Sequence, residues 1–230
     1  KELGAPMDVL WFRLSRQASD PVETMGRFDA GRIFIMINRG DNWQCGYVIP
    51  KGSLSRLQEA GLQAFRDGIV ELAPYAADRV VEIASWDDVK LLTVGVDRLE
   101  RWHKPGVLCI GDAAHTMSPV GGVGINLAIQ DAVAAANILA EPLRTGRLAD
   151  ADLAAVQRRR EFPTRVTQAM QVAVQKNIIS RVLAGRETIR PPLPVRLLDR
   201  FPILRRIPAR LVGLGVRPEH VHSPERKSSV

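Results

Sequence analysis

The chain has 230 residues, enough for one large domain or two small ones, and 46% of them are hydrophobic, as in ordinary globular proteins. Its two cysteines, Cys45 and Cys109, exclude a disulfide framework, and no secretory leader is recognised, so we expect a reducing cytoplasm. No apolar run approaches the roughly 20 residues that a membrane helix needs.

The formal net charge is +7, and much of the excess lies in late arginines. These are Arg158, Arg159, Arg160, Arg190, Arg196, Arg200, Arg205, Arg206, Arg210 and Arg217. They are not interleaved with exposed aromatic residues and match no nucleic-acid motif, so we expect no nucleic-acid partner. A solvated basic face is the simplest explanation. Contact with anionic lipid headgroups, or with an acidic N-terminal half, stays open.

The first part of the chain, residues 1–97, is predicted to be a sheet with one helix. Runs of β-forming residues predict strands at 8–14, 32–38, 43–49 and 89–96. The turn residues of 39–42 join the second and third strands into a hairpin. Apolar residues at helical spacing predict a helix over 53–72, which Ser53 caps and Pro74 follows.

The most informative stretch is 107–140, VLCIGDAAHTMSPVGGVGINLAIQDAVAAANILA. It predicts an apolar strand over 107–110, a Gly-Asp turn, a loop that holds Pro119 and several glycines, and a helix of small residues from Gly124. A carboxylate at a strand end, next to a glycine loop and a helix N-terminus, can hold a polar cofactor.

This stretch resembles the second flavin-contacting motif of the FAD-dependent aromatic-ring monooxygenases, the para-hydroxybenzoate hydroxylase type. The family pattern is GD-A-A-H, then P, then G-x-G-x-N, then D-A. Here it is carried by Gly111, Asp112, Ala113, Ala114, His115, Pro119, Gly122, Gly124, Asn126, Asp131 and Ala132. The resemblance is strong over roughly 98–140 and diffuse elsewhere.

The resemblance implies that FAD is the cofactor and that these residues contact it. The expected contacts are Gly111, Asp112, Pro119, Gly122, Gly124, Ile125 and Asn126. Asp112 would bind the ribityl hydroxyls, and the helix end at 124–126 would face the pyrimidine edge of the flavin. Pro119 would shape the pocket near the reactive ring position. No catalytic side chain is singled out, because His115 is expected to hold the loop by hydrogen bonding.

The family activity implied is hydroxylation of a small aromatic or similar electron-rich substrate through a flavin C4a-hydroperoxide, with NAD(P)H as transient electron donor. The substrate is expected between the early sheet and the 117–124 loop. A flavin-dependent reductase of the same superfamily and a non-catalytic module are the alternatives. A flavin-dependent halogenase is disfavoured, because Cys45 and Tyr47 replace the tryptophans of the W-x-W-x-I-P motif.

Two family features are missing from this sequence. There is no strand–GxGxxG–helix unit, which holds the FAD pyrophosphate in the family, and no middle Asp-Gly motif. We therefore expect the chain to be the C-terminal half of a longer flavoprotein, inactive alone, whose N-terminal half completes the cofactor site.

Helices are predicted for the rest of the chain. After a break at 141–147, a long helix should run over 153–184, with a kink or split at Pro163. Two short helices should follow over 197–214, the second of them starting at Pro208. The remaining histidines, His103, His220 and His222, have no companions at metal-ligand spacing, so no metal site is expected.

Together these elements predict an α+β fold. It combines a substrate-domain sheet, the last strand and flavin-contacting helix of a GR2-type FAD domain, and a C-terminal helical segment. The expected divisions are 1–97, 98–145, 146–222 and a disordered tail at 223–230. A homodimer, and peripheral contact of the basic C-terminal helices with the inner membrane, stay open.

Overall fold

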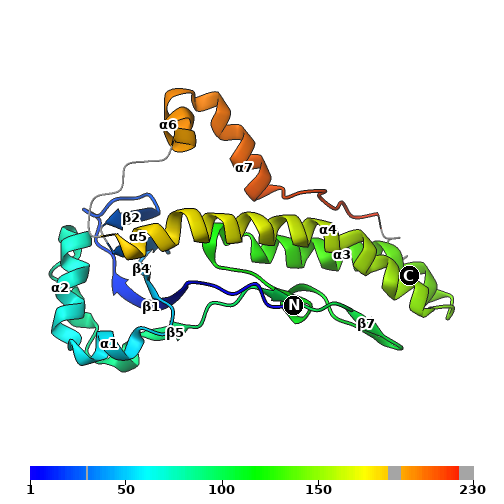
Figure 1. Cartoon of the computed structure of the whole chain (residues 1–230), viewed down its shortest axis with the longest axis horizontal. Coiled ribbons are helices and arrows are strands. Elements are labelled where there is room, and N and C mark those ends of the chain that lie inside the picture. Colours follow the sequence, from blue (N-terminus) through cyan, green and yellow to red (C-terminus); the bar gives the residue numbers. More distant parts are fainter. Residues whose placement is uncertain (30, 186–192, 223–230) are drawn as a thin grey trace, which may run out of the picture. The chain divides into compact units, whose positions relative to one another are not determined.

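The structure is a computed structural model that describes residues 1–29, 31–185 and 193–222. It divides into two compact units. The sheet unit contains the described residues of 5–94 and 174–185, and the motif unit contains those of 1–4, 95–173 and 193–222. Figure 1 shows the chain with its elements labelled.

The sheet unit is built on five antiparallel strands in the order β2-β3-β4-β1-β5. Their bounds are β1 Met7–Ser15, β2 Met25–Asp29, β3 Arg32–Asn38, β4 Asn42–Pro50 and β5 Lys90–Leu92. The predicted strands at 8–14, 32–38 and 43–49 and their hairpin are confirmed. The strand predicted over 89–96 is only three residues long. Val94 leaves the ladder because its N–H donates instead to Asp8 Oδ1, at 3.0 Å.

Alternation along β1 separates the two faces of the sheet. Leu10, Phe12 and Leu14 are buried in the main core, together with Phe65 and Ile69. These last two lie on the helix α2 (Leu62–Leu72), which therefore covers this face. The other face of β1 carries the half-buried Trp11 and the exposed Arg13.

The predicted helix over 53–72 is two helices, α1 (Leu54–Glu59) and α2, because the chain turns at Gly61. Gly61 has φ +91°, a left-handed conformation that glycine adopts without strain. The cap predicted at Ser53 is wrong. The Ser53 hydroxyl donates to the carbonyl of Pro50 at 2.7 Å, which closes the turn after β4 instead.

The motif unit starts with short strands and turns that precede a long helix. These are β6 Asp97–Arg98, β7 His103–Lys104, β8 Val107–Leu108, β9 His115–Thr116 and α3 Gly124–Arg144, with 3-10 turns at Gly111–Ala113 and Val120–Gly122. The strand predicted over 107–110 pairs only through β8, which forms a hairpin with β7. Ile110 is extended (φ −138°, ψ 164°) but lies outside this ladder.

Prolines interrupt the helices less than predicted. Pro142 lies inside α3, and Pro163 lies buried inside α4 (Asp150–Val174), which runs on without a break. The split comes instead at a π-helical turn, Gln175–Ile179, before α5 (Ser180–Ala184).

The C-terminal helices are α6 (Leu193–Arg200) and α7 (Arg206–Gly213), joined by a 3-10 turn. Pro208 lies in the first turn of α7 rather than at its start. The segment expected at 146–222 is not a body of its own, because α5 belongs to the sheet unit and α4 to the motif unit. The tail predicted at 223–230 lies outside the described residues.

One helical stretch of the described chain, Val120–Arg144, is long and apolar enough to cross a membrane, contrary to the sequence-based expectation. Its composition is weak support for such a role, because core helices of folded domains pass the same test. Near its middle lies Asp131, fully buried and paired with a buried arginine, Arg160, of α4. We therefore assign α3 to the motif unit, where its buried face contains Asp131.

Candidate functional site

The Gly-Asp turn meets α3 through the glycine. Gly111 has φ +57°, and a Cβ atom added there would lie 3.0 Å from the Cβ of Ala128 on α3. Its N–H donates to Asp131 Oδ2 at 3.1 Å. A larger residue would therefore push the turn away from the helix. The next residue, Asp112, turns outward and is exposed, with no hydrogen bond to the described residues.

The loop that follows is shaped by glycines with positive φ. Gly121 has φ +80° and Gly122 has φ +62°, and a Cβ atom at Gly122 would meet no atom within 4 Å. The carbonyl of Pro119 accepts a hydrogen bond from the Gly122 N–H at 3.1 Å, so it closes this tight turn. The loop thus presents bare backbone with open space above it.

Helix α3 starts directly after this loop, and its first turn contains Gly124, Ile125 and Asn126. The residue before it, Val123, gives no side-chain cap, so the N–H groups of the first turn lack that partner. Ile125 is 68% exposed. Asn126 Nδ2 donates to the carbonyl of Val212 at 3.4 Å, which links this turn to the end of α7.

A buried ionic network lies under the Gly-Asp turn. Asp131 Oδ2 is 2.6 Å from His115 Nε2, and Asp131 Oδ1 accepts from Arg160 Nε at 2.9 Å. Burial opposes ionisation of Asp131. The hydrogen bonds from His115, Arg160 and the Gly111 N–H outweigh burial and hold the pKa of Asp131 below its usual value.

This network explains why the motif contains both His115 and Asp131. His115 is 1% exposed and packs against the ring of Trp102 at 5.0 Å between centroids. It is bonded to a carboxylate that also holds Gly111, so it fixes the turn, as predicted. Arg160, counted in the sequence among the late basic residues, is not part of a solvated face. It is fully buried and also contacts Glu219 at 3.3 Å.

Two glutamines on α4, neither of them predicted from the sequence, hold the glycine loop and the strand pair β6–β9 that precedes it. Gln171 Oε1 accepts from the Ser118 N–H at 3.1 Å, and its Nε2 donates to the carbonyls of Ser118 and Val120 at 2.8 and 3.0 Å. Gln168 Nε2 donates to the carbonyls of Asp97 and Thr116 at 2.6 and 3.1 Å. Both glutamines are buried, so the loop is tied to α4.

A signal for this arrangement does exist in the sequence. Arg160, Thr164, Gln168 and Gln171 recur at a spacing of three or four residues, which places them on one face of a helix. All four side chains are at most 5% exposed. A polar stripe at helical spacing would ordinarily be assigned to the solvent face. Here Arg160 pairs with Asp131, Thr164 bonds the carbonyl of Arg160 in its own helix, and the two glutamines bond backbone groups outside α4.

The structure therefore brings the predicted cofactor contacts to one end of α3. Gly111 lies against Ala128 in the second turn of α3, and Asp112 follows it in the chain. Pro119 and Gly122 precede the helix, and Gly124–Asn126 start it. These groups fit a flavin. The exposed carboxylate of Asp112 can accept hydroxyl hydrogen bonds, the open glycine backbone admits a flat ring, and the uncapped N–H groups favour negative charge.

Comparison with known proteins agrees with this geometry. The FAD binding domain family matches residues 2–170. The chain is 36% identical over 207 residues to 6-methylpretetramide 4-monooxygenase of Streptomyces rimosus, covering 89% of this chain and 48% of that enzyme. It is 31% identical over 144 residues to kynurenine 3-monooxygenase of Stenotrophomonas maltophilia, covering 61% of this chain and 29% of that enzyme.

Among solved structures, PqsL of Pseudomonas aeruginosa, described as a probable FAD-dependent monooxygenase, shares the fold with a TM-score of 0.61 and 21% identity. The match covers 80% of this chain and 50% of that structure. The chain thus spans about half the length of the Streptomyces enzyme and of PqsL. The α+β fold prediction is confirmed, and the chain belongs to the FAD-dependent aromatic monooxygenase family, whose FAD binding domain it carries in part.

Proposed function

We propose that this chain is the substrate-domain and C-terminal part of an FAD-dependent, NAD(P)H-using monooxygenase that hydroxylates an aromatic or similar electron-rich substrate. The observation that carries the proposal is the convergence of Asp112, the bare glycine turn and the uncapped start of α3 at one place. FAD, when bound, supplies the activation of dioxygen and the oxygen transfer.

The chain itself supplies orientation and electrostatics. Asp112 holds hydroxyl groups of the cofactor, and the N–H groups at 124–126 stabilise negative charge on its ring. Gln171 fixes the loop, and Gln168 fixes the strand pair before it, so that these groups keep their positions when substrate arrives. His115 takes no proton from the substrate in this proposal, because its Nε2 is already bonded to Asp131 inside the core.

Labelled dioxygen tests the proposal. The 230-residue chain and the longest product of its gene are each incubated with FAD, NADPH or NADH, and hydroxylated aromatic compounds under ¹⁸O₂. We expect the flavin-loaded protein to incorporate one ¹⁸O atom into each product molecule. A product that gains two hydrogens and no ¹⁸O would identify a reductase instead. Absence of turnover in every preparation that binds FAD would overturn the monooxygenase proposal.

A further inference from the structure

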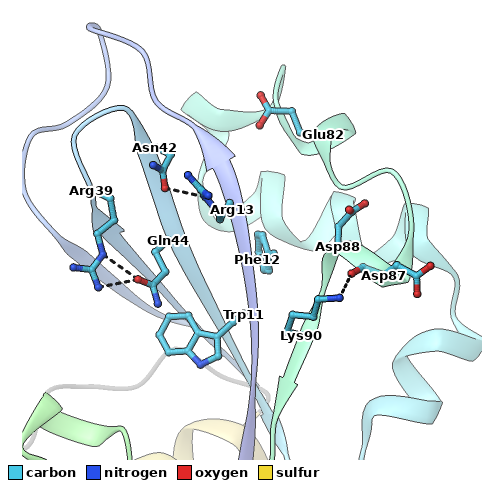
Figure 2. Close-up of a pocket in the computed structure, with 10 residues that line it drawn as sticks. All are labelled: Trp11, Phe12, Arg13, Arg39, Asn42, Gln44, Glu82, Asp87, Asp88 and Lys90. Carbon is cyan, nitrogen blue, oxygen red and sulfur yellow. Dashed lines mark hydrogen bonds between the residues drawn. The ribbon is translucent and has the colours of Figure 1, made fainter. Parts of the chain in front are cut away.

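A groove lies on the face of the sheet opposite the main core, wholly inside the sheet unit (Figure 2). Its volume is about 800 Å³. Its lining comes from β1, the β3–β4 hairpin, β5 and the turns before β5, through Trp11, Phe12, Arg13, Arg39, Asn42, Gln44, Glu82, Asp87, Asp88 and Lys90. Ligand pockets typically hold ~300–1,000 Å³, so this groove has room for more than a single aromatic ring.

An indole forms a flat surface in this groove. Trp11 pairs with Gly46 across the sheet, and a Cβ atom at Gly46 would lie 3.1 and 3.2 Å from two carbons of the Trp11 ring. The indole therefore lies over the backbone of β4, where only glycine leaves space for it. It is half-buried, so part of the ring remains available for stacking.

The groove lining also contains three cations, Arg13, Arg39 and Lys90. Arg39 donates to Gln44 Oε1 from Nε and Nη2, at 3.0 and 2.8 Å, and Arg13 donates to Asn42 Oδ1 at 3.3 Å. Lys90 donates to a backbone carbonyl at 2.6 Å. Within the described part of the chain, none of the three forms an ion pair with a carboxylate.

The carboxylates of the lining lie away from Trp11 and Arg39, on the side of the groove where Lys90 also lies (Figure 2). Glu82 accepts from the N–H and the hydroxyl of Ser15, at 2.7 and 2.5 Å, and Asp88 accepts from the Ser85 N–H at 2.9 Å. These acids are engaged by neutral donors rather than by the groove cations. The positive charge beside Trp11 thus remains unneutralised at hydrogen-bonding distance.

We infer that this groove binds a planar, multi-ring aromatic compound that carries an anionic oxygen. The rings would stack on Trp11, and the anionic oxygen would accept hydrogen bonds from Arg39 and Arg13. One part of this inference rests on the proposed function, namely that the ligand of the groove is the substrate of the hydroxylation. It assigns substrate selection to side chains that lie outside the flavin-contacting motif.

Calorimetric titration of the 230-residue chain with anthraquinone-2-carboxylate tests the inference without flavin or NAD(P)H. The neutral analogue 2-(hydroxymethyl)anthraquinone and the single-ring benzoate are titrated in parallel. We expect the three-ring carboxylate to bind at least about tenfold more tightly than either, because only it combines stacking with a charged hydrogen bond. Equal binding of all three compounds, or none of the carboxylate, would overturn the inference.

Three variants locate the site. Arg39→Gln should weaken the carboxylate about tenfold and change the neutral analogue less than about twofold, because it removes one charge-assisted bond. Trp11→Leu should weaken both compounds. Gly46→Ala keeps the tryptophan but crowds its ring, so it should also weaken both, which guards against misfolding of Trp11→Leu. Arg56→Gln, on the exposed surface of α1, is the matched control.

Unchanged affinity in Arg39→Gln and Gly46→Ala, each with a native circular dichroism spectrum, would overturn the inference. Failure of this inference can be distinguished from failure of the proposed function, because titration and oxygen labelling are separate experiments. If titration succeeds and labelling fails, the groove is confirmed and its ligand is not a hydroxylation substrate. If labelling succeeds and titration fails, the proposed function stands and the groove has no part in substrate selection.

Discussion

Gln171 hydrogen-bonds both backbone groups of Ser118, accepting from its N–H at 3.1 Å and donating to its carbonyl at 2.8 Å. The two residues come from α4 and from the glycine loop, far apart in the sequence. The side-chain amide provides the hydrogen-bond partners that a neighbouring strand would give to backbone groups in a sheet. The position of the loop therefore depends on a residue whose hydrogen bonds go to Ser118 and Val120 rather than to a predicted cofactor contact.

Gln171→Leu should loosen this loop. The substitution leaves a buried N–H and two carbonyls without a partner, which costs about 1–3 kcal/mol in the free energy of unfolding. Hydrogen exchange followed by mass spectrometry should show faster exchange over 117–124, with the sheet unit unchanged. Gln63→Leu, on the exposed surface of α2, is the control. Equal exchange in wild type and Gln171→Leu would show that the loop does not depend on this amide.

Asp131→Asn should be among the most damaging changes in the motif unit. It leaves the buried Arg160 without its main counterion, and breaking a buried ion pair on one side costs about 3–5 kcal/mol. Urea unfolding measures the loss. The double variant Asp131→Asn/Arg160→Met should recover part of it, because the orphaned charge is gone. Additive losses in the double variant would contradict the pairing.

Acid should destabilise the sheet unit through Asp20. Burial opposes its ionisation, but hydrogen bonds from Arg79, Trp43 and the Gln17 N–H lower the pKa of Asp20 to about 2. A carboxyl group with a lowered pKa in the folded state stabilises the fold above its unfolded pKa. This stabilisation is lost as the pH falls through the folded pKa. The free energy of unfolding should therefore decrease between about pH 4 and about pH 2.

Asp20→Asn provides the check on this assignment. The variant should be less stable at neutral pH, and its free energy of unfolding should fall less steeply over the same acid range. Asp67→Asn, at an exposed carboxylate of α2, should keep the wild-type acid profile. Chemical denaturation at a series of pH values gives the profiles. Identical acid slopes for wild type and Asp20→Asn would contradict the prediction.

The C-terminal helices α6 and α7 are predicted to contact a membrane surface. Phe201, Ile203 and Ile207 are exposed, at 51%, 69% and 67%, beside the exposed arginines Arg206 and Arg210. Such a basic, apolar surface favours anionic lipid. We predict salt-sensitive flotation with phosphatidylglycerol vesicles and none with phosphatidylcholine vesicles, weakened by Arg206→Glu/Arg210→Glu. Absence of flotation at low salt would exclude this role.

Local sequence patterns predicted the strands of the hairpin, the strand before them and the start of α3. The alternation of β1, β3 and β4 and the hairpin between β3 and β4 were predictable, because side-chain period and turn residues specify them. The start of α3 and the glycine loop followed from a motif with many fixed spacings. The predicted contact residues at Asp112, Pro119 and Gly122 stay predictions.

Interactions between distant segments account for what the sequence did not predict. β5 stops early because Asp8 takes the N–H of Val94, and α4 passes Pro163 while buried side chains hold it on both sides. The roles of Arg160 and Gln171 depend on the backbone that faces α4 in the fold. No local pattern of α4 specifies that backbone, so the sequence alone does not indicate what its polar stripe contacts.

The affinity for FAD of wild type and Asp112→Ala, measured by flavin fluorescence on the longest product of the gene, tests the account most directly. If Asp112 binds cofactor hydroxyls, its removal should weaken FAD binding roughly tenfold to a hundredfold, because a hydrogen bond to a charged group contributes that much to affinity. Asp150→Ala, at an exposed acid of α4, should bind as wild type does. Equal FAD affinity of wild type and Asp112→Ala, at equal thermal stability, would contradict the assignment of the flavin site.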